Sequence, residues 1–195
     1  MTTKALSGVL ASVLAAILLA ACGYENEKAS TPPAPAPEPA PAWTIYHDSD
    51  GRFRISYPSG WLRSSQSLTP GLVDPREIVS IGTSNMRPGG ELCAHLPANA
   101  LEDLGAEDAF LSIEERAEPN LADYAPRPVR FTLGPPNKDF DGVHCVREPN
   151  DLLQWWLSFR DGSRAFYALV SLGRSASEET RRQVLETLNS FAVDG

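Results

Sequence analysis

Hydrophobic and polar residues alternate with a period of two over several segments of the chain, and this alternation predicts β-strands. Phe53, Ile55 and Tyr57 fall on one face of such a segment, with polar residues between them. The preceding Asp50-Gly51 is typical of a tight turn, so residues 43–47 are the expected partner strand of a hairpin. Further strands are predicted at residues 78–83, 110–116 and 129–133.

The clearest predicted hairpin joins residues 152–160 to residues 163–172 through Asp161-Gly162. A two-residue turn there pairs the apolar residues of one face: Leu157 with Phe166, Trp155 with Ala168, and Leu153 with Val170. On the other face it sets Trp156 opposite Tyr167, with Leu169 nearby. We expect a helix to cover this second face. If no helix does, Trp156, Tyr167 and Leu169 are the candidate binding patch.

Two helices are predicted. Residues 98–104 follow Pro97 and end at Gly105, which suit the two ends of a short helix. Near the end of the chain, Ser177 is an expected N-cap. The apolar stripe of this last helix consists of Val184, Leu185, Leu188 and Phe191. Strands joined mainly by hairpins, with a few helices, predict the α+β class.

Both ends of this region resemble a known family. The segment from Gly51 to Trp61 resembles the opening strand of PsbP-like domains, which ends in a Tyr-Pro-x-Gly-Trp corner. Residues 188–191 resemble the family's terminal Leu-x-Ser-Phe. The resemblance implies an antiparallel sheet flanked by helices, that is, an α/β/α sandwich. It also implies a role in binding another protein, without a shared active site, and the family includes bacterial surface lipoproteins.

The N-terminus carries the one long apolar run of the chain, Val9 to Ala21, which falls short of the ~20 residues that span a bilayer. Leu19-Ala20-Ala21-Cys22 resembles the lipobox of bacterial lipoproteins. Residues 1–21 are therefore predicted to be a signal peptide, and lipid on Cys22 is expected to hold the protein at the extracytoplasmic face of a membrane. The alternative is an ordinary signal peptide that contains a cysteine.

Proline dominates the segment that follows: it occupies six of the ten positions from Pro32 to Pro41. Such a sequence favours extended polyproline II, so residues 22–42 are read as the lipidated cysteine and a semi-rigid spacer. Residues 43–195 are predicted to form one globular domain. Its two cysteines, Cys93 and Cys145, are expected to form a disulfide, because exported proteins fold in an oxidising compartment.

Charge and composition narrow the range of partners. The formal net charge is −8, and no basic cluster is present. An acidic body is repelled by nucleic acid, so nucleic-acid binding is not expected. The lipid rather than the charge of the protein must then account for membrane attachment.

One motif faintly resembles a nucleophile site. Ser84 follows Gly82-Thr83, but Met86 stands where the Gly-x-Ser-x-Gly elbow needs its second glycine. A strand end is therefore the favoured interpretation, and no catalytic residue is assigned.

Metal binding is not predicted either. His95 and His144 lie near the two cysteines, but His144 and its neighbour Cys145 would point to opposite faces of a strand. The turns that begin at Asp48 and Asp139 lack the acid that a calcium loop needs at its last position. No metal ligand and no cofactor is therefore assigned.

The function expected from these observations is that of a membrane-anchored, non-enzymatic binding or accessory module of the cell envelope. Its expected partner is an envelope protein or a glycan. The alternative is a carrier that holds a small hydrophobic ligand or lipid near Trp156 and Tyr167. A hydrolase is the third and least favoured option.

Overall fold

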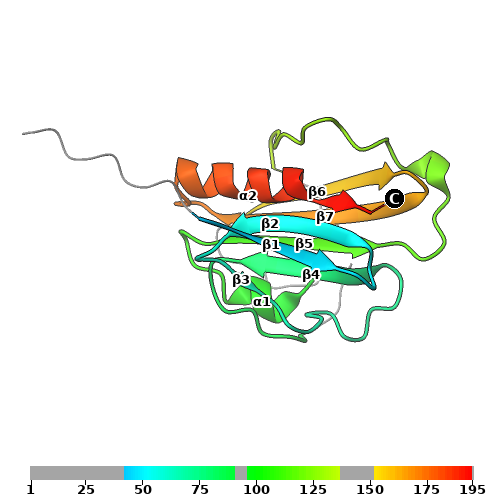
Figure 1. The fold of residues 1–195 in the computed structure, drawn as a ribbon. Coiled ribbons are helices and arrows are strands. Elements are labelled where there is room, and N and C mark those ends of the chain that lie inside the picture. Colours follow the sequence, from blue (N-terminus) through cyan, green and yellow to red (C-terminus); the bar gives the residue numbers. More distant parts are fainter. Residues whose placement is uncertain (1–41, 91–95, 137–151, 195) are drawn as a thin grey trace, which may run out of the picture. The chain divides into compact units, whose positions relative to one another are not determined.

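A computed structural model describes residues 42–90, 96–136 and 152–194 of the chain (Figure 1). The strands β1 (Trp43–Asp48), β2 (Phe53–Pro58) and β8 (Ala192–Val193) form a small sheet in the order β1-β2-β8. The large sheet has the order β3-β4-β5-β7-β6. Its strands are β3 (Leu62–Arg63), β4 (Arg76–Gly82), β5 (Ala109–Glu115), β6 (Leu152–Asp161) and β7 (Arg164–Gly173). All neighbouring strands within both sheets are antiparallel.

The predicted α+β fold, an α/β/α sandwich, is wrong: the described part of the chain is mostly β. The two α-helices described are α1 (Ala98–Glu102) and α2 (Glu178–Ser190), and a 3-10 turn, η1, spans Leu121–Asp123. The first hairpin does not extend the large sheet but forms a sheet of its own. Together with α2 it covers one face of the large sheet, while loops and the five-residue α1 cover the other (Figure 1).

The first predicted hairpin is confirmed. β1 pairs with β2 along its whole length, from Trp43 opposite Pro58 to Asp48 opposite Phe53. In the connecting loop, Asp48 Oδ1 accepts a hydrogen bond of 2.6 Å from the backbone N–H of Gly51. The short polar side chain of the aspartate thus closes the turn locally, as such residues commonly do.

The second predicted hairpin is also confirmed, but its register differs by two residues. Trp155 lies opposite Val170, and Asp161 pairs with Arg164. The turn is therefore Gly162-Ser163, one residue later than expected, with Gly162 at a φ of +60° that glycine adopts without steric cost. Because the shift is an even number of residues, each side chain stays on its predicted face.

The predicted strand at residues 129–133 is wrong. Val129 is fully exposed and Phe131 is buried, but the backbone pairs with no strand among the described residues. Instead, Asn189 of α2 binds the segment: its Oδ1 accepts a 2.7 Å hydrogen bond from the N–H of Phe131. A side chain of α2 thus takes the place of a strand neighbour.

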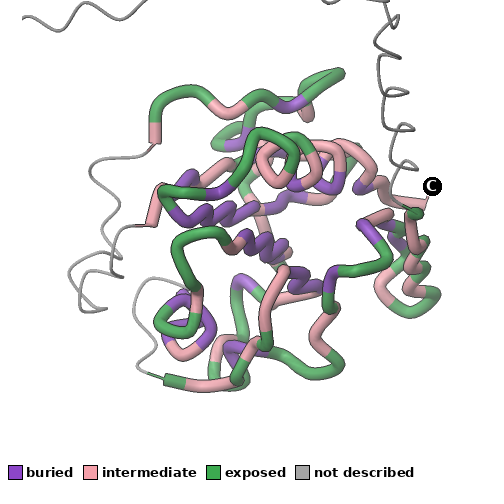
Figure 2. The backbone as a smooth tube through the Cα atoms, turned by 90° about the vertical axis from the view of Figure 1, so that its left-hand side faces the viewer, coloured by how far each residue is buried: buried purple, intermediate pink, exposed green. Residues whose placement is uncertain are grey.

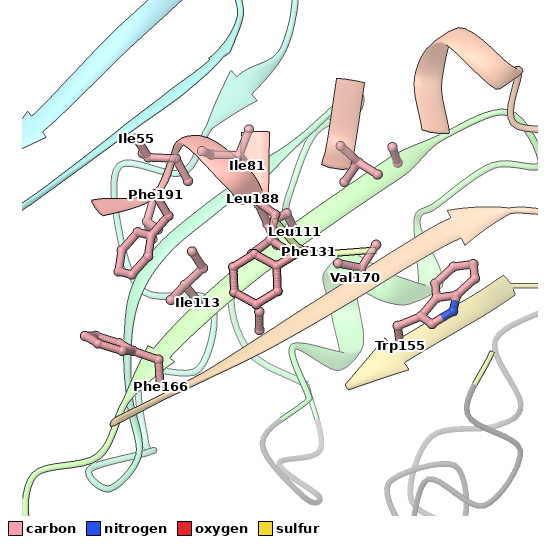
Figure 3. Packing of buried hydrophobic residues seen from close by; sticks show 14 of the residues in the cluster. Ile55, Ile81, Leu111, Ile113, Phe131, Trp155, Phe166, Val170, Leu188 and Phe191 are labelled. Atoms are coloured by element: carbon pink, nitrogen blue, oxygen red, sulfur yellow. The ribbon is translucent and has the colours of Figure 1, made fainter. Parts of the chain in front are cut away.

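The main hydrophobic core lies between the large sheet, β2 and α2 (Figure 3). Ser177 caps α2 as predicted, accepting a 3.0 Å hydrogen bond from the N–H of Thr180. The helix turns Val184 and Leu188 into the core, both fully buried. Phe191, just after the helix, has its ring centroid 5.2 Å from that of Phe166 and 5.6 Å from that of Phe53. These aromatic contacts join α2 to both sheets.

Burial follows this arrangement: β4, β5, β7 and the inner side of α2 are largely buried, whereas β1 and most connecting loops are half-buried or exposed (Figure 2). Within residues 42–90, 96–136 and 152–194, we find no helix with the length and apolar character needed to cross a bilayer.

Candidate functional site

The second face of the large sheet, which points away from the main core, carries an unusual number of polar side chains. The strand registers align Glu77, Glu114, Tyr167 and Ser158 in one row across β4, β5, β7 and β6. The next row consists of Ser80, Ser112, Leu169 and Trp156. Loops cover much of this face, so several of these polar groups are buried and need partners.

The Glu77 carboxylate accepts several hydrogen bonds from its neighbours. Its Oε2 accepts hydrogen bonds from the backbone N–H groups of Leu68 and Thr69, at 2.7 and 3.0 Å. Hydroxyl groups of Ser67, Thr69 and Ser80 also donate to this carboxylate. Such charge-assisted bonds are stronger than neutral ones, so Glu77 fixes the loop at residues 67–69 over the sheet.

Glu114 is the opposite case. Its side chain lies on the sheet next to Glu77 and only 2% of its surface is exposed. Its Oε2 has no hydrogen-bond partner in the part of the chain that the structure describes. Burial, helped by the negative charge of Glu77, raises the pKa of Glu114 to about 8. The group is therefore mainly a neutral acid at pH 7.

Three aromatic residues lie beyond Glu114. Trp156 and Tyr167 belong to the same face of the sheet, and Tyr124 comes from the loop after η1. The Trp156 and Tyr167 rings are stacked, with centroids 5.0 Å apart and planes at 25°. The hydroxyl groups of Tyr167 and Tyr124 are hydrogen-bonded at 2.7 Å. Burial and this bond raise the pKa of Tyr124 to about 12. The Tyr124 hydroxyl thus holds its proton near neutral pH and presents a neutral polar group.

Beside the two tyrosines lies an open pocket of about 380 Å³, which we call the tyrosine pocket. Tyr124, Tyr167 and Ser158 contribute hydroxyl groups to it. The loop at residues 116–123 contributes the remaining polar groups: Arg116, Glu118, Asn120 and Asp123.

Contacts within the fold hold this loop in place, among them a 3.1 Å hydrogen bond from the backbone N–H of Ala117 to Asp74 Oδ1. Arg116 Nε lies 3.1 Å from Asp74 Oδ1 in an ion pair that lacks hydrogen-bond geometry. The Asn120 side chain caps η1 by accepting from the N–H of Ala122. Both the sheet side and the loop side of the tyrosine pocket are thus set by contacts within the fold rather than by a ligand.

No family model matches the chain, and searches of curated proteins and of solved structures found no match. The resemblance to PsbP-like domains therefore stays a prediction from the two terminal motifs. Function has to be argued from the geometry of the site itself, because a fold alone does not determine it.

The residues of the predicted binding patch do not form one exposed surface: Leu169 is buried, whereas Trp156 and Tyr167 are half-buried. Tyr167 lines the tyrosine pocket, and half-buried Trp156 supports it from behind. Leu169 is buried, at 2% exposure, in a second apolar cluster with Phe110 and Leu101 of α1. Trp156 lies opposite Leu169 rather than opposite Tyr167, which pairs with Ser158, so the stacked rings are diagonal neighbours.

Several predicted residues fall outside the described part of the chain. These are Cys22, Cys93, Cys145, His95 and His144, so lipidation, the disulfide and the rejected zinc site all stay predictions. Among the residues that are described, no group of three or more His, Cys, Asp or Glu side chains is placed to hold a metal ion.

Ser84 lies just after β4, with a buried hydroxyl that has no hydrogen-bond partner among the described residues. His47, the histidine that the structure describes, belongs to β1 of the small sheet. Its Nε2 lies 2.8 Å from Asp194 Oδ2. The described residues therefore give Ser84 no histidine base of the kind that a catalytic serine needs.

Sequence reasoning missed Glu114, Arg116 and Tyr124. Glu114 alternates with apolar residues along β5, a pattern that ordinarily marks a solvent-exposed face. Tyr124 follows a short turn and meets Tyr167 from 43 residues away. The period-two pattern of the strands could identify the second face, but not the loop that covers it.

Proposed function

We propose that this chain is a lipid-anchored, extracytoplasmic binding module that holds a component of the cell envelope in the tyrosine pocket. The observation that carries the proposal is the hydrogen-bonded pair of Tyr124 and Tyr167 beside an open polar pocket. Ligand sites are usually preformed hollows in which aromatic side chains and a few convergent polar groups meet, and Tyr124 and Tyr167 supply both here.

Attachment to the membrane is the part of the proposal that rests on sequence. The lipobox ending at Cys22 and the proline-rich spacer support a tethered domain. A tethered domain remains close to the envelope, so an envelope component is the partner that it meets most often.

The alternative carrier function requires a closed apolar cavity near Trp156 and Tyr167. The pocket described there is open and lined mainly by polar side chains. This supports a polar partner rather than a hydrophobic ligand or a lipid.

Photo-crosslinking in living cells tests the proposal. Ser158 is exposed at the tyrosine pocket, so a photoreactive amino acid in its place leaves the core unchanged. We expect light-dependent adducts to an envelope component from this position. The matched control carries the same amino acid at Val129, which is fully exposed and does not line the pocket. Equal adducts from both positions, or none from position 158, would contradict the proposal.

A further inference from the structure

We propose that the ligand of the tyrosine pocket is a short neutral glycan, an inference that rests on the binding function proposed above. Size, charge and the chemistry of the lining groups each point to this class.

The size of the pocket suits one or two sugar rings. Its volume of about 380 Å³ lies at the lower end of the range for small-molecule sites, roughly 300–1,000 Å³. Because the pocket is open to solvent, a longer chain could continue out of it. A terminal or internal unit of an envelope glycan therefore fits without any change in the fold.

The charges around the pocket disfavour an anion. Arg116 is its one lining cation and already faces Asp74. Glu118 and Asp123 place two carboxylates on the same loop. An anionic ligand such as a phosphate would meet these carboxylates in a protein whose net charge is −8. A neutral ligand avoids this repulsion.

Hydrogen-bonding capacity favours a polyol. A sugar hydroxyl both donates and accepts, so it can use carboxylate acceptors, the guanidinium donors and the lining hydroxyls at the same time. The loop at residues 116–123 offers the carboxylates, the guanidinium group and the Asn120 amide, and the hydroxyls come from Tyr124, Tyr167 and Ser158. A ligand with a single polar group would leave most of them to water.

The aromatic wall is rigid, which favours a ring-shaped ligand. Tyr167 is stacked on Trp156 and hydrogen-bonded to Tyr124, whose ring centroid lies 5.6 Å away. A sugar ring presents C–H groups of slight positive charge, and these are attracted by the electron-rich face of an aromatic ring. Little conformational entropy is lost at a wall that is already ordered.

Isothermal titration calorimetry tests this inference on the full-length lipoprotein in a detergent without a sugar headgroup. The neutral probes are N-acetylglucosamine, its β-1,4 disaccharide, maltose and cellobiose. The charged probes are choline and glycerol 3-phosphate. We expect saturable binding of at least one neutral saccharide and none of glycerol 3-phosphate.

Two variants locate the binding site. Tyr124→Phe removes the bridging hydroxyl, and we expect it to weaken saccharide binding about tenfold. Its matched control is Tyr57→Phe, which removes the same group from β2, outside the pocket, and should bind normally. Ser158→Trp fills the pocket with a large side chain. Because Ser158 is exposed, the change does not disturb the core, and we expect it to abolish binding.

The outcomes separate the glycan inference from the binding function. If no neutral saccharide binds, or if Ser158→Trp binds as well as wild type, the glycan inference is overturned. If choline binds and no saccharide does, the ligand of the tyrosine pocket is a cation, which the tyrosine rings and the carboxylates would attract. In either case a pocket-specific adduct from position 158 would leave the binding function standing.

Discussion

At the scale of a single residue, the burial of Glu114 opposes the ionisation of its carboxyl group. Its pKa rises from the ordinary value of 4.5 to about 8 in the folded protein. Between these two pH values the unfolded chain releases a proton that the folded chain retains. The free energy of unfolding contributed by this group therefore falls as pH rises from about 4.5 to about 8, and levels off above that.

Glu114→Gln should remove this fall in unfolding free energy with rising pH. The amide stays neutral at every pH, so we expect the variant to exceed wild type in unfolding free energy by on the order of 2 kcal/mol at pH 8, with little difference at pH 4. Urea unfolding followed by circular dichroism across this range measures the effect. Glu118→Gln is the control, because it makes the same chemical change at an exposed side chain. An identical pH dependence in Glu114→Gln and wild type would contradict the predicted titration.

At the scale of elements, α2 is the piece that binds the two sheets into one core. Phe191 contacts aromatic rings of both, and Ser190 Oγ accepts a 2.7 Å hydrogen bond from the N–H of Ser56 in β2. Asn189 holds the irregular segment at Phe131. Three consecutive residues, the last two of α2 and the one that follows it, therefore connect three separate parts of the fold.

The N-cap of α2 allows a direct test of how much this helix contributes to stability. Ser177→Ala removes the acceptor for the Thr180 N–H, and we expect a loss of about 1 kcal/mol in unfolding free energy. The control is Ser175→Ala, an exposed serine two residues earlier whose backbone rather than side chain contacts Ala106. Chemical denaturation of both variants measures the difference. Equal stability of the two would show that the cap is not formed in solution.

At the scale of the whole molecule, the proposed function assigns ligand binding and membrane attachment to two different parts of the chain. The domain displays its tyrosine pocket on one face of the large sheet. The anchor at Cys22 is proposed to supply the membrane affinity that an acidic surface cannot. The two parts can therefore be tested separately.

Cys22→Ser should move the protein from the membrane fraction to the soluble fraction, because an oxygen in this position receives no diacylglyceryl group. Fractionation of cells followed by immunoblotting measures the distribution. Cys93→Ser makes the same atomic change away from the lipobox and should remain with the membrane. Membrane retention of Cys22→Ser would contradict the lipid anchor.

The amino-acid sequence by itself determined several local elements of this protein, although the strand it predicted at residues 129–133 did not form. Both hairpins and the capped helix α2 follow from alternation, turn residues and a serine N-cap, all of which act over a few neighbouring residues. The register of the second hairpin differed by two residues because alternation fixes only the face of each residue, and the position of Gly162 in the turn selects the pairing.

Tertiary structure alone decided the architecture and the site. Whether a hairpin joins a sheet or covers it depends on packing between distant residues, so the two-sheet arrangement was not visible in local patterns. The Tyr124–Tyr167 bond and the juxtaposition of Glu114 with Glu77 join residues 43 and 37 positions apart, respectively (167 − 124 and 114 − 77). The long-range contacts that close the chain therefore create both the tyrosine pocket and the buried Glu114 carboxyl on the same face of the sheet.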